Sequence, residues 1–241
     1  MNIIIEENAE LLGKKASEII SKAIREAIIE KGSARILLAT GASQLSTYTQ
    51  LIKEDIEWGN VEMFHLDEYI GLPMTHVASF RKYLKERFVD LVHPKNANFI
   101  SGEGNITENI RILTEELRKS TIDVALIGIG ENGHIAFNDP PADFETDESY
   151  ICVTLDERCK LQQVGEGWFS SLDEVPNEAI TMSVKEIMRS KKIVSIVPHQ
   201  VKATAVRDTL KGEIGPMIPA SILRSHQDWT LLLDVESASL L

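Results

Sequence analysis

The chain of 241 residues is 43% hydrophobic and carries 25 basic and 37 acidic side chains, which leaves a net charge of −12. Length and apolar content fit one α/β domain over residues 1–241 with a sizeable core. The negative charge argues against a nucleic-acid or membrane-surface partner, because both are polyanions that would be repelled.

No stretch of the sequence approaches the roughly 18 to 20 apolar residues that a membrane span needs. The start lacks the basic head and long apolar stretch of a secretory signal, so we expect a cytoplasmic protein. The two cysteines, Cys152 and Cys159, are too few and wrongly spaced for a zinc site or a disulfide framework. We interpret both as reduced thiols.

Apolar periodicity predicts a regular alternation of helices and strands. The first half contains, in chain order, a helix over residues 9–31, a strand over 35–39, a helix over 45–52, a strand over 61–66, a helix over 80–91, a turn-rich connection over 93–98, a helix over 106–117 and a strand over 124–127. The second half contains strands over 150–155, 179–182, 193–197 and 230–234, and helices over 183–189, after residue 200, and over 219–224. This alternation predicts a Rossmann-like α/β fold, a parallel sheet with helices on both faces.

The loop after the strand over 35–39 consists of small residues, Thr40, Gly41, Ala42 and Ser43. A strand, a small loop and a helix in this order can hold a phosphate through the loop N–H groups and the positive end of the helix. The loop has one glycine and matches no nucleotide-binding pattern, so an ordinary turn is the alternative.

Two adjacent acids, Asp67 and Glu68, follow the next predicted strand. Open α/β sheets bind their ligands at the carboxyl ends of strands, so one of these acids is a candidate general base. The alternative is that both simply begin a polar loop.

A glycine-rich loop over residues 128–139 follows the buried strand over 124–127. It presents Asn132, His134 and Asp139, a titratable imidazole next to groups that can orient it. An ordinary turn with an exposed histidine is the alternative.

Lys202 lies in the first helical turn after the strand over 193–197, where an ammonium and free N–H groups can converge on one anion. An exposed surface lysine is the more usual case. The segment over residues 156–173, which contains Arg158, is the least regular part of the chain, and its charge and glycines leave a lid as one interpretation.

Together these motifs resemble the glucosamine-6-phosphate deaminase (isomerase) family, which belongs to a broader group that includes 6-phosphogluconolactonases. Four blocks in family order carry the resemblance, Ala39-Thr40-Gly41-Ala42-Ser43, Phe64-His65-Leu66-Asp67-Glu68-Tyr69-Ile70-Gly71-Leu72, residues 128–140 and Ala179-Ile180-Thr181-Met182-Ser183-Val184. The lactonases typically have arginine at the position of Tyr69 and threonine at that of Ile135.

The resemblance implies conversion of an amino-sugar 6-phosphate to a ketose 6-phosphate with release of ammonia, and hence a hydrolase of amino-sugar metabolism that uses neither metal nor organic cofactor. It implies that Asp67 is the base, that His134 opens the sugar ring, and that Asp139 with Asn132 supports the imidazole. It assigns phosphate binding to the Thr40–Ser43 loop and Lys202, with Glu68 as a further substrate contact.

Three departures from the family pattern concern the choice of sugar. The family commonly has glutamate at Asp139, whose side chain is shorter by roughly 1.5 Å, one carbon–carbon bond. Asn132 replaces an aspartate of some members. The arginine that joins the lysine on the phosphate aligns with Gly167, and Arg158 is a loosely aligned substitute. An epimer such as galactosamine 6-phosphate is therefore an alternative substrate.

Two other functions compete with the deaminase. The first is lactone hydrolysis of the 6-phosphogluconolactonase type, against which Tyr69 and Ile135 count. The second is a non-catalytic sugar-phosphate sensor, against which the full set of acid and base residues counts. The expected partner is a small phosphorylated amino sugar, and a homo-oligomer remains possible because an apolar helix face can pack on a neighbour.

Overall fold

A computed structural model describes all residues, 1–241, and its centre is a sheet of seven parallel strands. In spatial order the strands are β1 (Asn2–Glu6), β10 (Trp229–Asp234), β9 (Lys192–Val197), β6 (Val124–Ile127), β2 (Ala34–Leu38), β3 (Val61–His65) and β5 (Asn96–Asn98). The sheet confirms the expected Rossmann-like α/β fold. The strands β1 and β5 were not expected, because neither is a long apolar run and both lie at the edges of the sheet.

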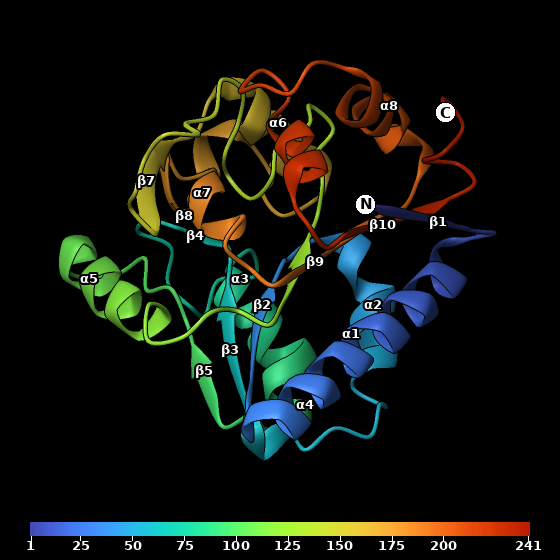
Figure 1. Cartoon of the computed structure of the whole chain (residues 1–241). Coiled ribbons are helices and arrows are strands. Elements are labelled where there is room, and N and C mark those ends of the chain that lie inside the picture. Colours follow the sequence, from blue (N-terminus) through green and yellow to red (C-terminus); the bar gives the residue numbers. More distant parts are fainter.

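Helices cover both faces of this sheet (Figure 1). One face carries α1 (Ala9–Lys31), α2 (Leu45–Leu51), α3 (Phe80–Leu84) and α4 (Asp90–Val92). The other face carries α5 (Ile106–Leu117), α7 (Val184–Ile187) and α8 (Ala203–Lys211). The helix expected over residues 80–91 is interrupted by a π-helical segment, η3 (Lys85–Val89).

Side-chain alternation along the central strands separates the two cores. On β6, Val124 and Leu126 pack with α1 and α2, whereas Ala125 and Ile127 pack on the opposite face. Because side chains alternate with a period of two, a continuous apolar strand is buried on both faces. This is why a purely apolar run correctly predicted a central strand.

Helix α1 begins and ends where its sequence predicts. The side chain of Asn8 accepts hydrogen bonds from the N–H groups of Glu10 and Leu11, and Gly32 adopts a left-handed conformation at φ 77°. Both are standard helix-terminating devices. The buried stripe on the inner side of α1 matches the apolar periodicity of the sequence.

A second, antiparallel sheet of three strands lies beside the first, in the order β4 (Asp67–Tyr69), β8 (Glu178–Met182) and β7 (Tyr150–Thr154). The alternation of strands and helices in the sequence did not predict this second sheet. The chain leaves β3 at Leu66 and joins the small sheet immediately, so Asp67 lies where the two sheets meet.

The segment that looked least regular contains a helix, α6 (Glu157–Gly165), capped by Asp156. Single turns of 3₁₀ helix complete the structure, namely η1 (Ala42–Gln44), η2 (Trp58–Asn60), η4 (Leu172–Glu174) and η5 (Gln200–Lys202), together with the longer η6 (Pro219–Ser225). None of the helices combines the length and the apolar character required to cross a bilayer. Cys152 and Cys159 are both free thiols.

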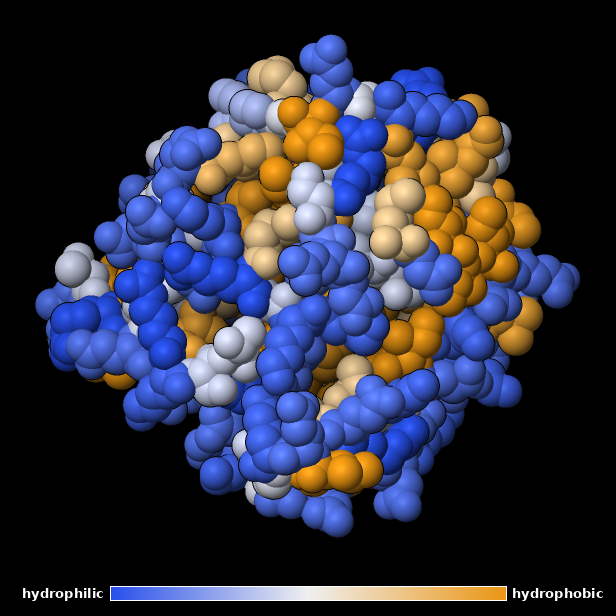
Figure 2. Space-filling view, viewed as in Figure 1, coloured by the Kyte–Doolittle hydropathy of each residue, from blue (hydrophilic) through white to orange (hydrophobic).

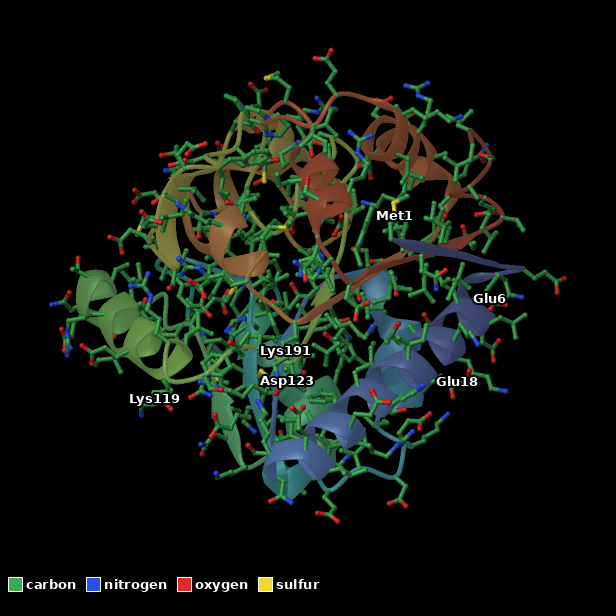
Figure 3. The ribbon with its side chains drawn as sticks, in the orientation of Figure 1. Met1, Glu6, Glu18, Lys119, Asp123 and Lys191 are labelled. Atoms are coloured by element: carbon green, nitrogen blue, oxygen red, sulfur yellow. The ribbon has the colours of Figure 1, made fainter.

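Ion pairs and a hydrogen bond link neighbouring elements at the amino end of the main sheet. The buried carboxylate of Asp123 lies 3.2 Å from the ammonium of Lys191, with which it is labelled in Figure 3, and 2.8 Å from that of Lys31. It also accepts a hydrogen bond from the backbone N–H of Arg35. This cluster joins β2, β6 and β9 at the end opposite to their carboxyl termini.

The face of the molecule in Figure 2 is largely hydrophilic, and its broadest apolar area lies over β1 and the neighbouring C-terminal residues. Ile3, Ile5 and Val235 are exposed there. Edge strands with exposed apolar side chains are open to pairing with other chains.

Candidate active site

The order of strands in the main sheet reverses between β2 and β6. From β2 the chain continues to β3 and β5 on one side, and from β6 it continues to β9 and β10 on the other. The loops that follow β2 and β6 therefore diverge and leave a crevice at the carboxyl ends of the strands, which is where open α/β sheets bind ligands.

A cavity of about 240 Å³ opens at this crevice. The residues expected from the sequence that line it are Thr40, Gly41, Ala42, Ser43, Asp67, His134 and Lys202. They lie in the segments that follow four adjacent strands of the main sheet, β3, β2, β6 and β9. Groups that are far apart in the sequence thus meet in one cavity.

Asp67 lines the cavity, with 7% of its surface exposed. Burial, and secondarily the neighbouring charge of Glu68, raise the pKa of Asp67 to about 8. At neutral pH this carboxyl is consequently largely protonated. A cationic group placed beside it would favour the carboxylate, the form that can accept a proton.

His134 is held by two side chains of its own loop. Its Nδ1 lies 3.0 Å from Oδ1 of Asp139, within ion-pair distance, although the alignment falls outside hydrogen-bond geometry. Asn132 donates a 2.8 Å hydrogen bond to the same carboxylate oxygen and accepts one from the backbone N–H of His134. The shorter aspartate therefore still reaches the imidazole.

The surroundings of Asp139 favour the ionised form of its carboxyl. Burial raises the pKa of Asp139, but the contacts with His134 and Asn132 outweigh this effect, so the pKa lies below its ordinary value. An ionised carboxylate beside Nδ1 favours the tautomer with the proton on that nitrogen, in which Nε2 is the nitrogen that can accept a proton from a ligand. Asn132 and Asp139 do not line the cavity and act behind the imidazole.

The glycines of this loop bring the backbone close to the imidazole. The N–H of Gly130 donates to the carbonyl of His134 at 2.9 Å, and Gly133 has a positive φ of 84°. Asn138 is buried and donates to the carbonyls of Ile135 and Met182, both at 2.9 Å. The loop is thus tied to β8 of the small sheet.

Hydrogen bonds from two side chains hold the small-residue loop after β2 in place. The hydroxyl of Tyr83 donates to the carbonyl of Gly41 at 2.9 Å, and the amide of Gln44 donates to the hydroxyl of Ser43 at 3.0 Å. Gly41 has a φ of 108°, which favours glycine. Because α2 has only seven residues, the loop N–H groups rather than a helix dipole are the main resource for an anion.

Lys202 supplies a cation to the same cavity. Burial lowers its pKa, and the carboxylates of Glu166 and Glu131 act in the opposite direction. Its ammonium makes no hydrogen bond to a protein group, which leaves its donors for a ligand.

Helix α6 and the residues after it line the cavity from the side opposite the main sheet, through Gln162, Gln163, Glu166 and Trp168. Glu166 accepts hydrogen bonds from Gln162 at 2.8 Å and from Trp168 at 3.2 Å. The sequence did not predict these contacts because the helix has little apolar periodicity. His199, in the turn after β9, and Glu131, in the glycine-rich loop after β6, also line the cavity.

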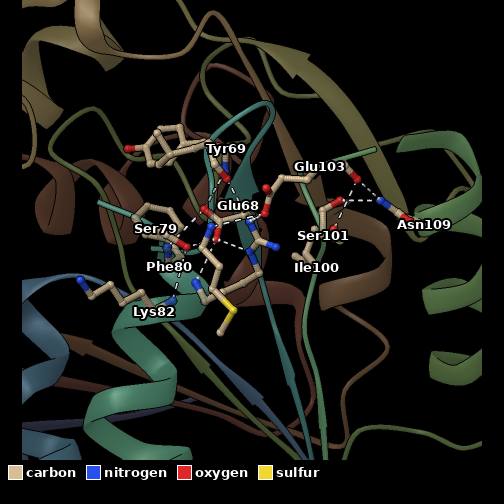
Figure 4. A network of polar contacts seen from close by, with 12 residues as sticks. Glu68, Tyr69, Ser79, Phe80, Lys82, Ile100, Ser101, Glu103 and Asn109 are labelled. Carbon is tan, nitrogen blue, oxygen red and sulfur yellow. Dashed lines mark hydrogen bonds and ion pairs between the residues drawn. The ribbon is translucent and has the colours of Figure 1, made fainter. Parts of the chain in front are cut away.

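Glu68 and Arg158 do not reach the cavity, so their assignment to substrate binding is corrected. Glu68 is completely buried and accepts hydrogen bonds from the backbone N–H groups of Tyr69, Phe80 and Arg81 and from the Ser79 hydroxyl, and it pairs with the Arg81 guanidinium (Figure 4). It fixes the start of α3 to β4. Arg158 is exposed on the outer side of α6.

Sequence comparison places this site in a known family. The sequence profile described as glucosamine-6-phosphate isomerases/6-phosphogluconolactonase matches residues 7–232. The chain belongs to this family.

Within the family, the chain is similar to proteins named glucosamine-6-phosphate deaminase. The one from Thermoanaerobacter sp. (strain X514) is 38% identical, over 100% of this chain and 95% of that protein. The one from Clostridium botulinum (strain Eklund 17B / Type B) is 36% identical, over 100% of this chain and 97% of that protein.

Two solved structures, one from each branch of the family, differ in how similar they are to this chain. A structure described as a monomeric glucosamine-6-phosphate deaminase matches with a TM-score of 0.90 and 33% identity, and covers 100% of both chains. A 6-phosphogluconolactonase from Thermotoga maritima matches with a TM-score of 0.80 and 17% identity, over 97% of this chain and 98% of that chain. At that identity the lactonase shares the fold alone.

These comparisons correct one expectation. Classification of this chain as a hydrolase is wrong, because the relatives of 36–38% identity are named deaminases and the family description names isomerases. The hydrolytic members are the lactonases, which are the distant structural neighbours.

Proposed function

We propose that this protein is a cytoplasmic glucosamine-6-phosphate deaminase, which converts an amino-sugar 6-phosphate to a ketose 6-phosphate and ammonia. The observation that carries this proposal is the meeting of Asp67, His134 and Lys202 in one cavity at the point where the strand order reverses. A base, a proton relay and a phosphate site are the three elements that the reaction needs.

His134 acts first, on the closed sugar ring. Ring opening requires a proton to leave the anomeric hydroxyl and another to reach the ring oxygen. With Nδ1 beside Asp139, Nε2 accepts the proton from the anomeric hydroxyl and then donates it to the ring oxygen. The ionised Asp139 stabilises the imidazolium formed in between.

Asp67 then moves a proton between two carbons. The substrate ammonium at C2 favours the carboxylate form of Asp67, which removes the C2 proton and delivers it to C1, while one proton of the ammonium moves to the C1 oxygen, so that the aldehyde becomes an alcohol and the nitrogen forms a double bond to C2. The resulting imine at C2 takes up water and releases ammonia, so one water is consumed for each ammonia formed. None of these steps needs a metal or an organic cofactor.

The phosphate is bound at the other end of the cavity. The N–H groups of the Thr40–Ser43 loop and the ammonium of Lys202 are its proposed ligands, and they position the sugar without taking part in the chemistry. Lys202→Ala should therefore chiefly raise KM for the phosphorylated sugar. An unchanged KM would show that Lys202 does not bind the phosphate.

The decisive experiment incubates the purified protein with glucosamine 6-phosphate, galactosamine 6-phosphate, glucosamine and 6-phosphogluconolactone, and follows ammonia, ketose phosphate and lactone loss. We expect ammonia and ketose phosphate in equal amounts from one phosphorylated amino sugar. Asp67→Asn should lower that turnover by at least about 100-fold while substrate binding persists. Full activity in this variant, or lactone loss alone, would refute the proposal.

A further inference from the structure

Three potential metal ligands meet beside the active-site cavity. The ligating atoms of His199, Asp234 and Glu236 all lie within 4.8 Å of one another. His199 follows β9, and Asp234 ends β10. Because β9 and β10 are parallel neighbours, their carboxyl ends meet at one edge of the sheet, next to the cavity that His199 also lines.

Two of these residues are locked together. The backbone N–H of His199 donates to Oδ2 of Asp234 at 2.9 Å, and that of Ser237 donates to Oδ1 at 2.8 Å. Asp234 is only 2% exposed, so its carboxylate has a fixed orientation. Each of its oxygens keeps a second lone pair for another partner. His199 and Glu236 are exposed and give an ion access from solvent.

We propose that His199, Asp234 and Glu236 bind a divalent transition-metal ion of the Zn²⁺ type. One imidazole nitrogen with carboxylate oxygens is a donor set that zinc and related metals accept, whereas Mg²⁺ and Ca²⁺ prefer oxygen alone. Three protein ligands leave at least one position for water or another ligand. The net charge of −12 favours the approach of a cation.

The ion would lie next to Lys202, the one lysine of the cavity lining. The backbone N–H of Lys202 donates to the carbonyl of His199 at 3.0 Å, and both residues line the cavity. Lys202 is the only lysine in that lining, which contains no arginine and three acids, Asp67, Glu131 and Glu166. A bound dication adds positive charge where the proposed function places the phosphate. The chemical steps do not pass through it.

The test titrates Zn²⁺ into the metal-stripped, full-length protein by isothermal calorimetry, with Co²⁺ absorption spectra as an independent readout of coordination. We compare the unmodified protein with His199→Gln and Glu236→Gln. The matched controls are His93→Gln and Glu213→Gln, two exposed residues outside the cluster. No substrate is used, so the result does not depend on the proposed enzymatic function.

We expect one equivalent of Zn²⁺ in the unmodified protein and in both controls. Affinity should fall by at least about tenfold in His199→Gln and in Glu236→Gln, because loss of even an indirect supporting group costs metal sites about that much. The Co²⁺ spectrum should change in the same two variants. Equal affinity in all five proteins, or no binding by the unmodified protein, would overturn the proposal.

Discussion

The imidazole of His134 rests against the backbone of Gly130. A Cβ atom added at Gly130 would lie 2.2 Å from the ring atoms Cε1 and Nε2, far closer than any real contact. Gly130→Ala must therefore displace the imidazole that we propose opens the sugar ring. Because a positioned acid or base contributes about 10²- to 10⁴-fold, we expect kcat to fall by at least about 100-fold, as measured by ammonia release.

The matched control for this variant is Gly59→Ala. An added Cβ at Gly59 meets no atom within 4 Å, and this glycine lies in η2, away from the cavity. We expect near-normal kcat there. If both variants kept full activity, the close packing of His134 on Gly130 would have no catalytic significance.

The second prediction concerns the pH dependence of activity. Asp67 must lose its proton to act as a base, and its pKa is raised to about 8 in the free protein, first by burial and then by Glu68. The ratio kcat/KM reports the free enzyme, so it should rise about tenfold per pH unit below pH 8 and then level off. A flat profile between pH 6 and 9 would contradict this assignment.

The third prediction concerns stability and the same carboxyl. Its folded-state pKa of about 8 lies above the ordinary value of 3.8, so between these values the folded protein holds a proton that the unfolded chain has lost. Stability must then decrease as pH rises through this window. Asp67→Asn removes that loss, and we expect its Tm relative to the unmodified protein to be higher at pH 9 than at pH 5. A lower relative Tm at pH 9 than at pH 5 would show that folding does not raise the pKa of Asp67.

The fourth prediction concerns Glu166, whose charge acts on Lys202 at the proposed phosphate end of the cavity. Glu166→Gln removes a negative charge that opposes an anionic ligand. We expect KM for the phosphorylated sugar to fall about 1.5- to 5-fold at low salt, the range for exposed charges, and less at high salt. Glu157→Gln, at the start of α6 and outside the cavity lining, should leave KM unchanged.

The fifth prediction concerns Glu68 as a structural residue. Its buried carboxylate pairs with Arg81 and accepts three backbone hydrogen bonds, so Glu68→Gln breaks a buried ion pair. We expect about 3–5 kcal/mol of lost stability, which corresponds to a decrease in Tm on the order of 10 °C. Glu103→Gln, which removes the half-exposed second partner of Arg81, should have a much smaller effect.

Much of the main sheet and the core of the site were predictable from the sequence. The apolar run over residues 124–127 and the amphipathic pattern over residues 9–31 each determine a local structure, because side-chain periodicity matches only one type of element. The motifs with Asp67 and His134 were identified because polar groups directly after strands converge at one edge of a parallel sheet.

Other features were decided only by the tertiary structure. The alternation of strands and helices did not reveal that β4, β7 and β8 form a separate antiparallel sheet, because pairing direction depends on contacts between distant residues. Glu68 and Asp67 are adjacent and chemically alike, yet the strand places one carboxylate in the core and the other in the cavity, since successive side chains point to opposite faces.

The cluster of His199, Asp234 and Glu236 and the lining from α6 belong to the same class of features. Their residues are separated in the sequence and have no characteristic spacing. The sequence by itself therefore determined most of the elements, the fold class and the candidate reacting groups, which depend on local periodicity and motif. The folded chain decided which polar side chains share a cavity, because that depends on how distant strand ends and α6 pack together.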